Sequence, residues 1–219
     1  MIEPLISPEV PVLHPSDTGE HALSLMQENN FTELPLVDDE EYIALVKEND
    51  LMDWETPNEA LSKADFLNYK PAAPGTAHPF DIIKLAFLQD ISVIPVIDNS
   101  NNYLGSVTRD TLFNYIANHS GFLLTGGIIV LEVNAGNYSL YEIARICENE
   151  DVMITNVQVA ASPQASILEV TLKTNRTSLQ GVVSALERYK YTVKEVYGEV
   201  ENADDTMGRY NLLMNYLNM

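Results

Sequence analysis

The sequence predicts a mixed α/β (α+β) protein with a duplicated unit in its first half and a different domain in its second half. Two observations predict this fold class. Residues 34–38 read LPLVD and residues 94–98 read IPVID, so one apolar string with a proline at its second position recurs 60 residues later. After Gly126 the hydrophobic pattern changes to four apolar strands and two helices that each carry one apolar face.

Each copy of the duplicated unit is expected to contain a strand, a helix, two strands and a second helix. Before the LPLVD string, Asp17 and Glu20 resemble a capping box at the start of a helix whose apolar face contains Leu25 and Met26. In the second copy, Pro79 suits the first turn of the corresponding helix. The two copies are therefore predicted to fold alike.

The two strands of each copy are predicted to form a hairpin. After the apolar strings the second copy has one extra loop residue, so the offset between the copies becomes 61. EEYIALVKENDL (40–51) then aligns with NNYLGSVTRDTL (101–112). The hairpin loops then fall at residues 38–41 and 98–102. Between the copies, residues 56–75 contain three prolines and a glycine, which predicts a partly helical connector.

The second half has the element order βαββαβ. Strands are expected at 128–133, 152–160, 167–174 and 191–196, and helices at 139–150 and 179–189. Ser139 and Glu142 form a capping box at the first of these helices, and Cys147 is expected in the core that its apolar face builds. Residues 204–219 space apolar side chains along one face, which predicts a C-terminal amphipathic helix.

The charge balance excludes several classes of partner. The 219 residues contain 12 Lys and Arg against 32 Asp and Glu, which gives a net charge of −20. Nucleic acids and anionic membranes are bound through clustered basic side chains, so neither is expected as a partner. The single cysteine cannot form an internal disulfide, and the N-terminal residues lack the pattern of a secretory signal. We therefore expect a cytoplasmic protein.

The duplicated strings resemble the CBS (cystathionine beta-synthase) domain pair, also called a Bateman module. The family pattern is an apolar strand ending in LPVVD, a short loop, an LVGIVT-like strand and an Asp-Leu helix start. The resemblance covers residues 1 to about 120, with repeat 1 at about 1–56 and repeat 2 at about 66–120. It implies a pseudo-twofold pair with two clefts, which in many members bind adenosine nucleotides and regulate an attached domain.

In the family, a Thr or Ser followed three residues later by an Asp holds the ribose, and a basic residue two positions before the LP proline often holds phosphate. In repeat 1, Asp50 is in place, but Lys47 replaces the Thr and Glu33 occupies the phosphate position. Glu33 is expected to oppose a phosphate group through its negative charge. The resemblance assigns Lys47 and Asp50 to the first cleft.

Repeat 2 departs from the family pattern as well. Thr108 is in place, but Thr111 stands at the Asp position, with Asp110 one residue early, and Val93 occupies the phosphate position. The resemblance assigns Thr108, Arg109 and Asp110 to the second cleft. The alternative is structural: Asp50 and Asp110 would only cap the helices that follow them.

Residues 124–200 resemble the ACT domain, a regulatory module with the ferredoxin-like βαββαβ arrangement that commonly binds amino acids. The loop NAGNYS (134–139) looks like the first strand-to-helix turn of that family, although Ala135 stands where a proline is usual. The resemblance makes Asn134, Gly136, Asn137 and Tyr138 candidates for a ligand site between two modules. The alternative is a tight turn in which Gly136 takes a positive φ and Asn137 caps locally.

The sequence disfavours catalysis. Nucleophilic catalysis needs a base beside the nucleophile, yet all four histidines lie in the first half and Cys147 lies in the second. The histidines lack the partners of a zinc site, and the chain has no Walker or Rossmann glycine pattern. We predict neither an enzyme nor a metal site.

The order CBS, CBS, ACT resembles the acetoin-utilisation B-type regulatory proteins. We expect a homodimer that requires no cofactor and senses either an adenosine compound in the CBS clefts or an amino acid at the ACT interface. The protein it regulates is not identified by the sequence. The alternative is an interaction scaffold with vestigial clefts. In that case residues 1–120, with 5 basic and 20 acidic side chains, would dock a partner protein.

Overall fold

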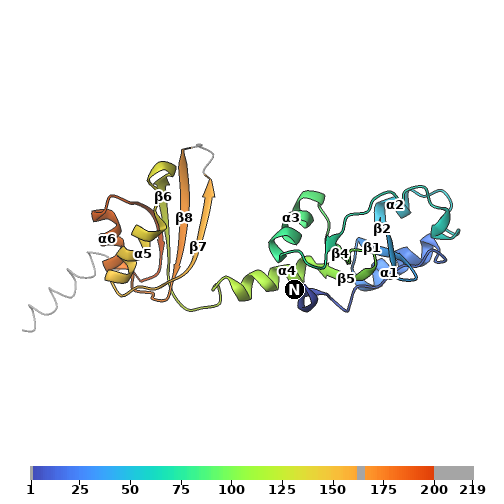
Figure 1. Ribbon diagram of the computed structural model, residues 1–219, viewed down its shortest axis with the longest axis horizontal. Coiled ribbons are helices and arrows are strands. Elements are labelled where there is room, and N and C mark those ends of the chain that lie inside the picture. The colour runs from blue at the N-terminus through green and yellow to red at the C-terminus, as the bar shows by residue number, and fades with distance from the viewer. Residues whose placement is uncertain (1, 162–165, 200–219) are drawn as a thin grey trace, which may run out of the picture. The chain divides into compact units, whose positions relative to one another are not determined.

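The computed structural model describes residues 2–161 and 166–199, and the chain forms two compact units, Met1–Ile116 and Ala117–Met219 (Figure 1). The predicted helix over 204–219 lies outside the described residues. The elements of the repeats are α1 (Gly19–Asn29), β1 (Glu33–Asp38), β2 (Glu41–Lys47), α2 (Glu48–Met52), β3 (Ala73–Pro74), α3 (Pro79–Gln89), β4 (Val93–Ile97), β5 (Tyr103–Thr108) and α4 (Arg109–His119), with the short 3-10 helices η1 (Glu3–Leu5) and η2 (Leu61–Lys63).

The predicted duplication is confirmed by the strand pairing. Strands β1 and β2 form an antiparallel hairpin, as do β4 and β5, and each hairpin has a register shift at the same place, after Leu36 and after Val96. In repeat 2 the short strand β3 pairs in parallel with β4. In repeat 1 the strand expected before α1 is reduced to one parallel bridge between Leu13 and Leu36.

The start of α1 differs from the prediction. Thr18, and not Asp17, is the N-cap, because its hydroxyl accepts a hydrogen bond from the His21 N–H at 3.2 Å. The Asp17 carboxylate instead accepts from the His14 N–H at 2.7 Å, which fixes the turn before the helix. Pro79 opens α3 as predicted.

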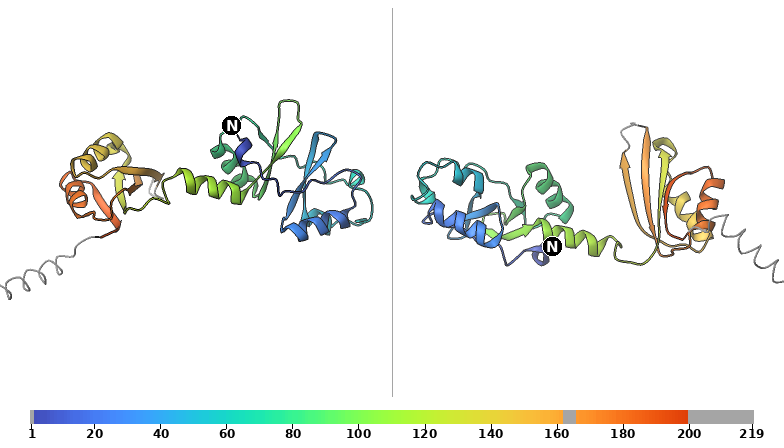
Figure 2. Two further views of the ribbon diagram at one scale, coloured as in Figure 1. Left: turned by 90° about the horizontal axis from the view of Figure 1, so that it is seen from below. Right: turned by 180° about the vertical axis from the view of Figure 1, so that it is seen from behind.

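The two repeats meet at their hairpins, which stand side by side in Figure 2 (left). The Tyr42 N–H donates to the Asn101 carbonyl at 3.1 Å, and the Tyr103 N–H donates to the Glu40 carbonyl at 2.7 Å. The Asn101 side chain adds a bond to the Tyr42 carbonyl at 3.0 Å. Because Tyr42 and Tyr103 occupy equivalent positions, the contact is pseudo-symmetric.

Each repeat has an apolar core, and each core borrows a residue from the other repeat. Val93 of β4 packs in the core of repeat 1 with Leu34 and Leu36. Leu45 of β2 packs in the core of repeat 2 with Ile94 and Val96. All six side chains are almost fully buried. The exchange couples the two repeats, because neither core is complete alone.

The second unit has the predicted element order βαββαβ. Its elements are β6 (Ile128–Asn134), η3 (Ala135–Asn137), α5 (Leu140–Asn149), β7 (Ile154–Ala161), β8 (Ile167–Thr174), α6 (Gln180–Arg188) and β9 (Thr192–Tyr197). The antiparallel sheet has the order β7-β8-β6-β9, and both helices cover one of its faces (Figure 1). Its core includes Cys147, and burial raises the pKa of that thiol to about 11.

Ser139 caps α5 as predicted, accepting from the Glu142 N–H at 3.3 Å. The Glu142 carboxylate accepts a hydrogen bond from the Tyr191 hydroxyl at 2.8 Å, so it ties α5 to the start of β9. Across residues 2–161 and 166–199, none of the helices has the length and apolar character that a bilayer span requires.

Candidate functional site

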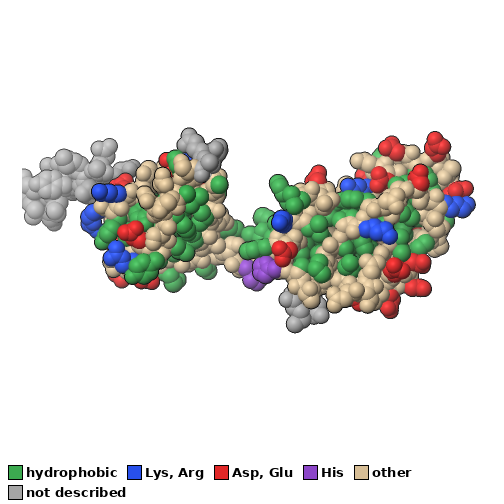
Figure 3. Space-filling model, turned by 45° about the horizontal axis from the view of Figure 1, so that its top comes forward, with side chains coloured by type: hydrophobic (Ala, Val, Ile, Leu, Met, Phe, Trp, Pro, Cys, Tyr) green, Lys and Arg blue, Asp and Glu red, His purple; other side chains and the backbone are tan. Residues whose placement is uncertain are grey.

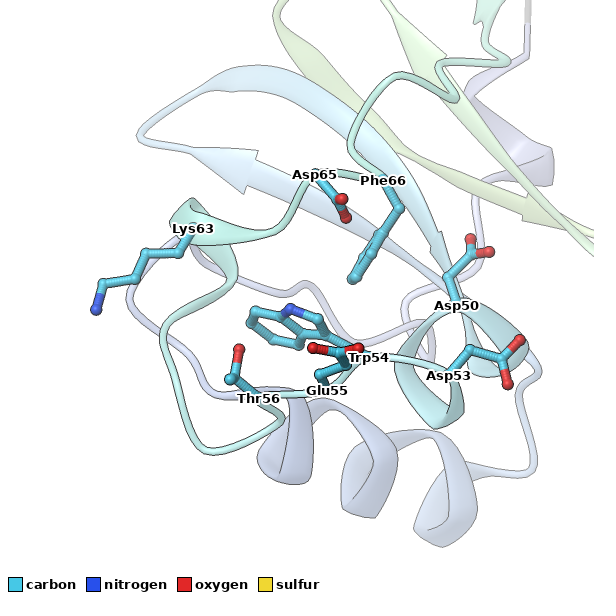
Figure 4. Close-up of a pocket in the computed structure, with 8 residues that line it drawn as sticks. All are labelled: Asp50, Asp53, Trp54, Glu55, Thr56, Lys63, Asp65 and Phe66. Atoms are coloured by element: carbon cyan, nitrogen blue, oxygen red, sulfur yellow. The ribbon is translucent and has the colours of Figure 1, made fainter.

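A hollow of about 530 Å³ opens beside α2, and we call it the Asp50 hollow (Figure 4). Its wall comes from α2 and from the connector that leads to repeat 2. The lining residues are Asp50, Asp53, Trp54, Glu55, Thr56, Lys63, Asp65 and Phe66. Of the two residues expected in the first cleft, the structure places Asp50 in this lining and leaves Lys47 outside it.

Two aromatic side chains form the apolar part of the hollow. The rings of Trp54 and Phe66 are 5.6 Å apart between centroids and meet edge to face at 87°. Trp54 also packs against the first residue of α1, since a Cβ atom on Gly19 would lie 2.9 Å from the indole Cε3. Gly19 therefore lets the indole approach the helix closely and fixes the ring in the hollow.

The charges around the hollow are mainly negative. Four carboxylates line it, and its one ammonium group, on Lys63, pairs with Glu59 at 3.4 Å. Figure 4 shows Lys63 pointing out of the hollow and Asp65 turned towards Trp54. At an effective dielectric constant near 20, two unit charges 4 Å apart interact by about 4 kcal/mol. The lining therefore opposes a phosphate group and favours a neutral or cationic ligand.

Lys47 lies at the end of β2 with its ammonium 4.2 Å from the centre of the Tyr69 ring, which is a cation–π contact. Tyr69 belongs to the connector. The backbone carbonyl of Tyr69 accepts a hydrogen bond from the Leu45 N–H at 2.9 Å. Lys47 thus helps to fix the connector against β2.

Glu33 is a buried carboxylate that joins the two repeats, with only 5% of its surface exposed. It accepts hydrogen bonds from the Ser92 N–H, from the Ser92 hydroxyl at 2.7 Å and from the Val93 N–H at 2.9 Å, and a further one from Thr32 at 2.7 Å. Burial alone would raise its pKa, but the hydrogen bonds outweigh burial and hold the pKa below its usual value. Glu33 therefore has hydrogen-bond donors within the protein, and its position in the sequence pattern does not predict them.

The residues expected in the second cleft are engaged at the start of α4. The Thr108 hydroxyl accepts from the Thr111 N–H at 3.2 Å and lies 2.7 Å from the Thr111 hydroxyl, so Thr108 caps the helix. The Arg109 guanidinium donates to the Ile91 carbonyl at 2.8 Å and to the Asp90 carboxylate at 2.7 Å. Asp110 is exposed and Asp50 is half-buried, and each lies within the first turn of its helix, α4 or α2, so neither aspartate is the cap.

The turn after β6 has a simple local structure. The Asn134 side chain accepts from the Gly136 N–H at 3.1 Å, so Asn134 rather than Asn137 makes the cap. The expected positive φ at Gly136 is wrong, since this glycine is not among the residues with left-handed backbone. Asn134, Gly136 and Asn137 are exposed, and Tyr138 packs partly against the core of the second unit.

The aromatic and acidic residues of the connector are the part of the site that sequence reasoning missed. The prolines of residues 56–75 predict a linker, and Trp54 lies two residues before this range. The available signal was the single tryptophan of the chain, followed by Phe66, within a polar stretch.

Within the described ranges, no three His, Cys, Asp or Glu side chains form a group that could hold a metal ion.

A model of the CBS domain family matches residues 2–56 and again residues 64–118, which together make up half of the chain. Three solved structures are also similar. A CBS domain pair/ACT domain protein from Thermotoga maritima is 15% identical, with 53% of this chain and 96% of that chain covered and a TM-score of 0.47. CBSX2 in complex with AMP is 19% identical, with 53% and 96% covered and a TM-score of 0.46. The CBS domains of a transcriptional regulator from Streptococcus pneumoniae are 20% identical, with 52% and 96% covered and a TM-score of 0.45.

Proposed function

Because this chain belongs to the CBS domain family, we propose that it is a regulatory protein that senses a small molecule and has no catalytic activity of its own. The observation that carries the proposal is the Asp50 hollow. Its volume of about 530 Å³ suits a small molecule, since ligand pockets span roughly 300–1,000 Å³. Asp50, which the family resemblance assigns to the ribose, lines the hollow together with the aromatic pair.

The charge of the hollow narrows the class of ligand. A base could pack on Trp54 and Phe66 while ribose hydroxyls donate to Asp50. A polyphosphate would meet carboxylates with no free ammonium in the lining, because Lys63 is paired with Glu59. We therefore propose an adenosine compound without phosphate, and S-adenosylmethionine, whose sulfonium is cationic, is the first to test.

The first prediction is that S-adenosylmethionine at millimolar concentration raises the melting temperature of the protein, whereas ATP does not. A ligand at 100 times its dissociation constant stabilises by about 2.7 kcal/mol. Asp50→Ala should abolish the shift, and Asp110→Ala, the same change in the first turn of α4, should keep it. Differential scanning fluorimetry measures both. Equal shifts in both variants, or tighter binding of ATP, would contradict the assignment of the hollow.

We also propose that the protein acts as a cytoplasmic homodimer and that its second unit is an ACT-like domain. The sheet order β7-β8-β6-β9, with both helices on one face, supports the ACT-like assignment. In this proposal an amino acid would bind near Asn134, Gly136, Asn137 and Tyr138 at an interface between two modules. A ligand that binds one arrangement of the modules more tightly would shift the equilibrium towards it and so regulate a partner protein. A thermal shift with amino acids alone would favour this site over the Asp50 hollow.

A second function is an interaction scaffold with vestigial clefts, and Glu33 is the observation that favours it. This carboxylate already bridges the repeats through hydrogen bonds to Ser92 and Val93, and its negative charge stands where the family resemblance places a phosphate-binding basic residue. Acidic side chains are also spread over the first unit (Figure 3). A partner protein that binds regardless of ligand and is released by salt would favour the scaffold over the sensor.

A further inference from the structure

The Asp50 hollow combines an aromatic wall with carboxylates that have no cationic partner. Its acidic lining residues are Asp50, Asp53, Glu55 and Asp65. Among residues 2–161 and 166–199, no Lys, Arg or His side chain pairs with any of these four. The one ammonium group of the lining, on Lys63, pairs with Glu59 and points out of the hollow (Figure 4). The described protein therefore leaves the negative charge of this cavity uncompensated.

The four carboxylates do not converge as metal ligands do. A bound Ca²⁺ or Mg²⁺ needs oxygen atoms within about 2.0–2.6 Å of one point. In the described part of the chain, no three His, Cys, Asp or Glu side chains form a group that could hold a metal ion. Figure 4 shows Asp65 above the Trp54 ring, whereas Asp50 and Asp53 belong to α2. The negative charge is spread around the cavity, so it suits a ligand whose positive charges are also spaced apart.

The aromatic wall adds a surface that attracts alkylammonium groups. A cation within about 6 Å of the centre of an aromatic ring is attracted by the ring face, and Trp gives the strongest contact. Trp54 and Phe66 stand edge to face in the hollow, with centroids 5.6 Å apart. The same connector already makes such a contact with the protein's own alkylammonium group, since the Lys47 ammonium lies 4.2 Å from the centre of the Tyr69 ring. Methylene groups between the charges of a ligand would pack on the rings.

Repeat 2 shows that the fold does not require this acidic lining. The equivalent residues of repeat 2 carry no charge, because Thr111, Asn114 and Ile116 stand at the positions of Asp50, Asp53 and Glu55. Like charges held close together repel one another and so cost stability. Since one repeat folds without these charges, their presence in the other points to a function at the hollow.

We propose that the Asp50 hollow binds a linear alkyl polyamine, whose ammonium groups meet the carboxylates while its methylene chain packs on Trp54 and Phe66. The proposal rests on the proposed function, which makes the hollow the sensing site, and it adds a second class of ligand to the adenosine compound. The volume of about 530 Å³ is sufficient for such a chain. A polyamine and S-adenosylmethionine would compete, because both place a cation against the same carboxylates.

The test uses Trp54 as a reporter, because it is the only tryptophan of the chain. Spermidine is titrated into the full chain at about 150 mM salt, which screens weak contacts with the negative surface. The fluorescence of Trp54 is followed, and isothermal titration calorimetry repeats the titration so that a complex without a fluorescence change is also detected. We expect saturable binding. Butylamine, which has a single ammonium group, should bind roughly tenfold more weakly, because it can pair with only one carboxylate.

Two variants of the hollow and one matched control locate the binding. Glu55→Gln and Asp65→Asn each remove one carboxylate and should each weaken spermidine binding roughly fivefold, as the loss of an exposed ion pair does. Both side chains are exposed, so neither change should unfold the chain, and circular dichroism checks this. Glu187→Gln removes one exposed carboxylate from α6 in the second unit and should leave the affinity unchanged.

The outcomes separate this proposal from the one on which it rests. Spermidine binding that does not saturate, or that all three variants weaken equally, would show a general attraction to an acidic protein and overturn the polyamine site. Binding of S-adenosylmethionine without spermidine would overturn this proposal and keep the proposed function. Binding of spermidine alone, weakened as expected, would keep the polyamine site and remove the adenosine compound. Binding of neither would overturn both.

Discussion

Glu33 shows how one residue can be read correctly for position and wrongly for role. The alignment of the repeats places it two residues before the LP proline, where its charge was expected to act only against phosphate. Its hydrogen-bond partners Ser92 and Val93 lie 59 and 60 residues away. A sequence pattern within one repeat cannot predict contacts between the repeats. The hydrogen bonds that join Glu33 to Ser92 and Val93 are therefore seen only in the folded structure.

The prediction at this scale is that Glu33→Gln lowers the free energy of unfolding by about 2–3 kcal/mol, because a neutral amide oxygen accepts weaker hydrogen bonds from the Ser92 and Val93 N–H groups than the ionised carboxylate does. Glu28→Gln, an exposed change on α1, should alter it by less than about 0.5 kcal/mol. Urea denaturation at neutral pH measures both. Equal effects of the two changes would refute the bridge.

The pH dependence of that difference follows from the lowered pKa of Glu33. The folded state holds the ionised carboxylate more tightly than the unfolded state does, so the stabilisation is complete above the ordinary value of 4.5. It is lost as the pH falls through the folded-state pKa. The gap between the wild-type protein and Glu33→Gln should therefore be constant near neutrality and close in acid.

Among the elements, the hairpins and most helices were predictable, because the hydrophobic period of a segment and the capping residues of a helix are local properties of the sequence. Ser139, Pro79 and the LPLVD and IPVID strings led to the right helices and strands. The capping residue of α1 was missed because Asp17 and Thr18 are both good caps, and only the bond to His21 decides between them. The contribution of the connector to the Asp50 hollow was missed, because the connector has no hydrophobic period from which packing could be inferred.

The prediction for an element concerns Gly105 in β5. This residue has φ +138°, and a Cβ atom there would overlap the side chain of Ile6, which runs alongside the strand. Gly105→Ala should therefore lower the free energy of unfolding by roughly 2–4 kcal/mol, from backbone strain and from the displaced N-terminal segment. Gly136→Ala should be nearly neutral, since its nearest neighbour would be Asn134 Oδ1 at 3.5 Å. Similar losses in both variants would show that Ile6 does not constrain Gly105.

For the whole molecule, the change of pattern after Gly126 was enough to predict two different parts, and the structure divides the chain after Ile116. Each unit has its own buried apolar cores. What each unit binds depends on its exposed side chains. The equivalent helices α1 and α3 differ in exposed residues, and the fold does not require these residues. This is why fold was easier to predict than partner or ligand.

The corresponding prediction is that the two units unfold separately. Leu131→Ala, in the core of the second unit, should lower one calorimetric transition, because large-to-small core changes cost about 2–5 kcal/mol. Leu36→Ala, in the core of repeat 1, should lower the other. Scanning calorimetry distinguishes the two. A single transition that both variants shift equally would mean that the units fold as one.

The unequal lengths of α2 and α4 determine how many ligand molecules one chain is expected to bind. Helix α2 ends at Met52, and the chain then supplies Trp54 and Phe66 to the Asp50 hollow, whereas α4 continues to His119 in the equivalent place. The position of Asp50 is held in repeat 2 by Thr111. The duplication has therefore not duplicated the hollow. Saturation would be reached at one ligand per chain, so the binding stoichiometry of a homodimer would be two and not four.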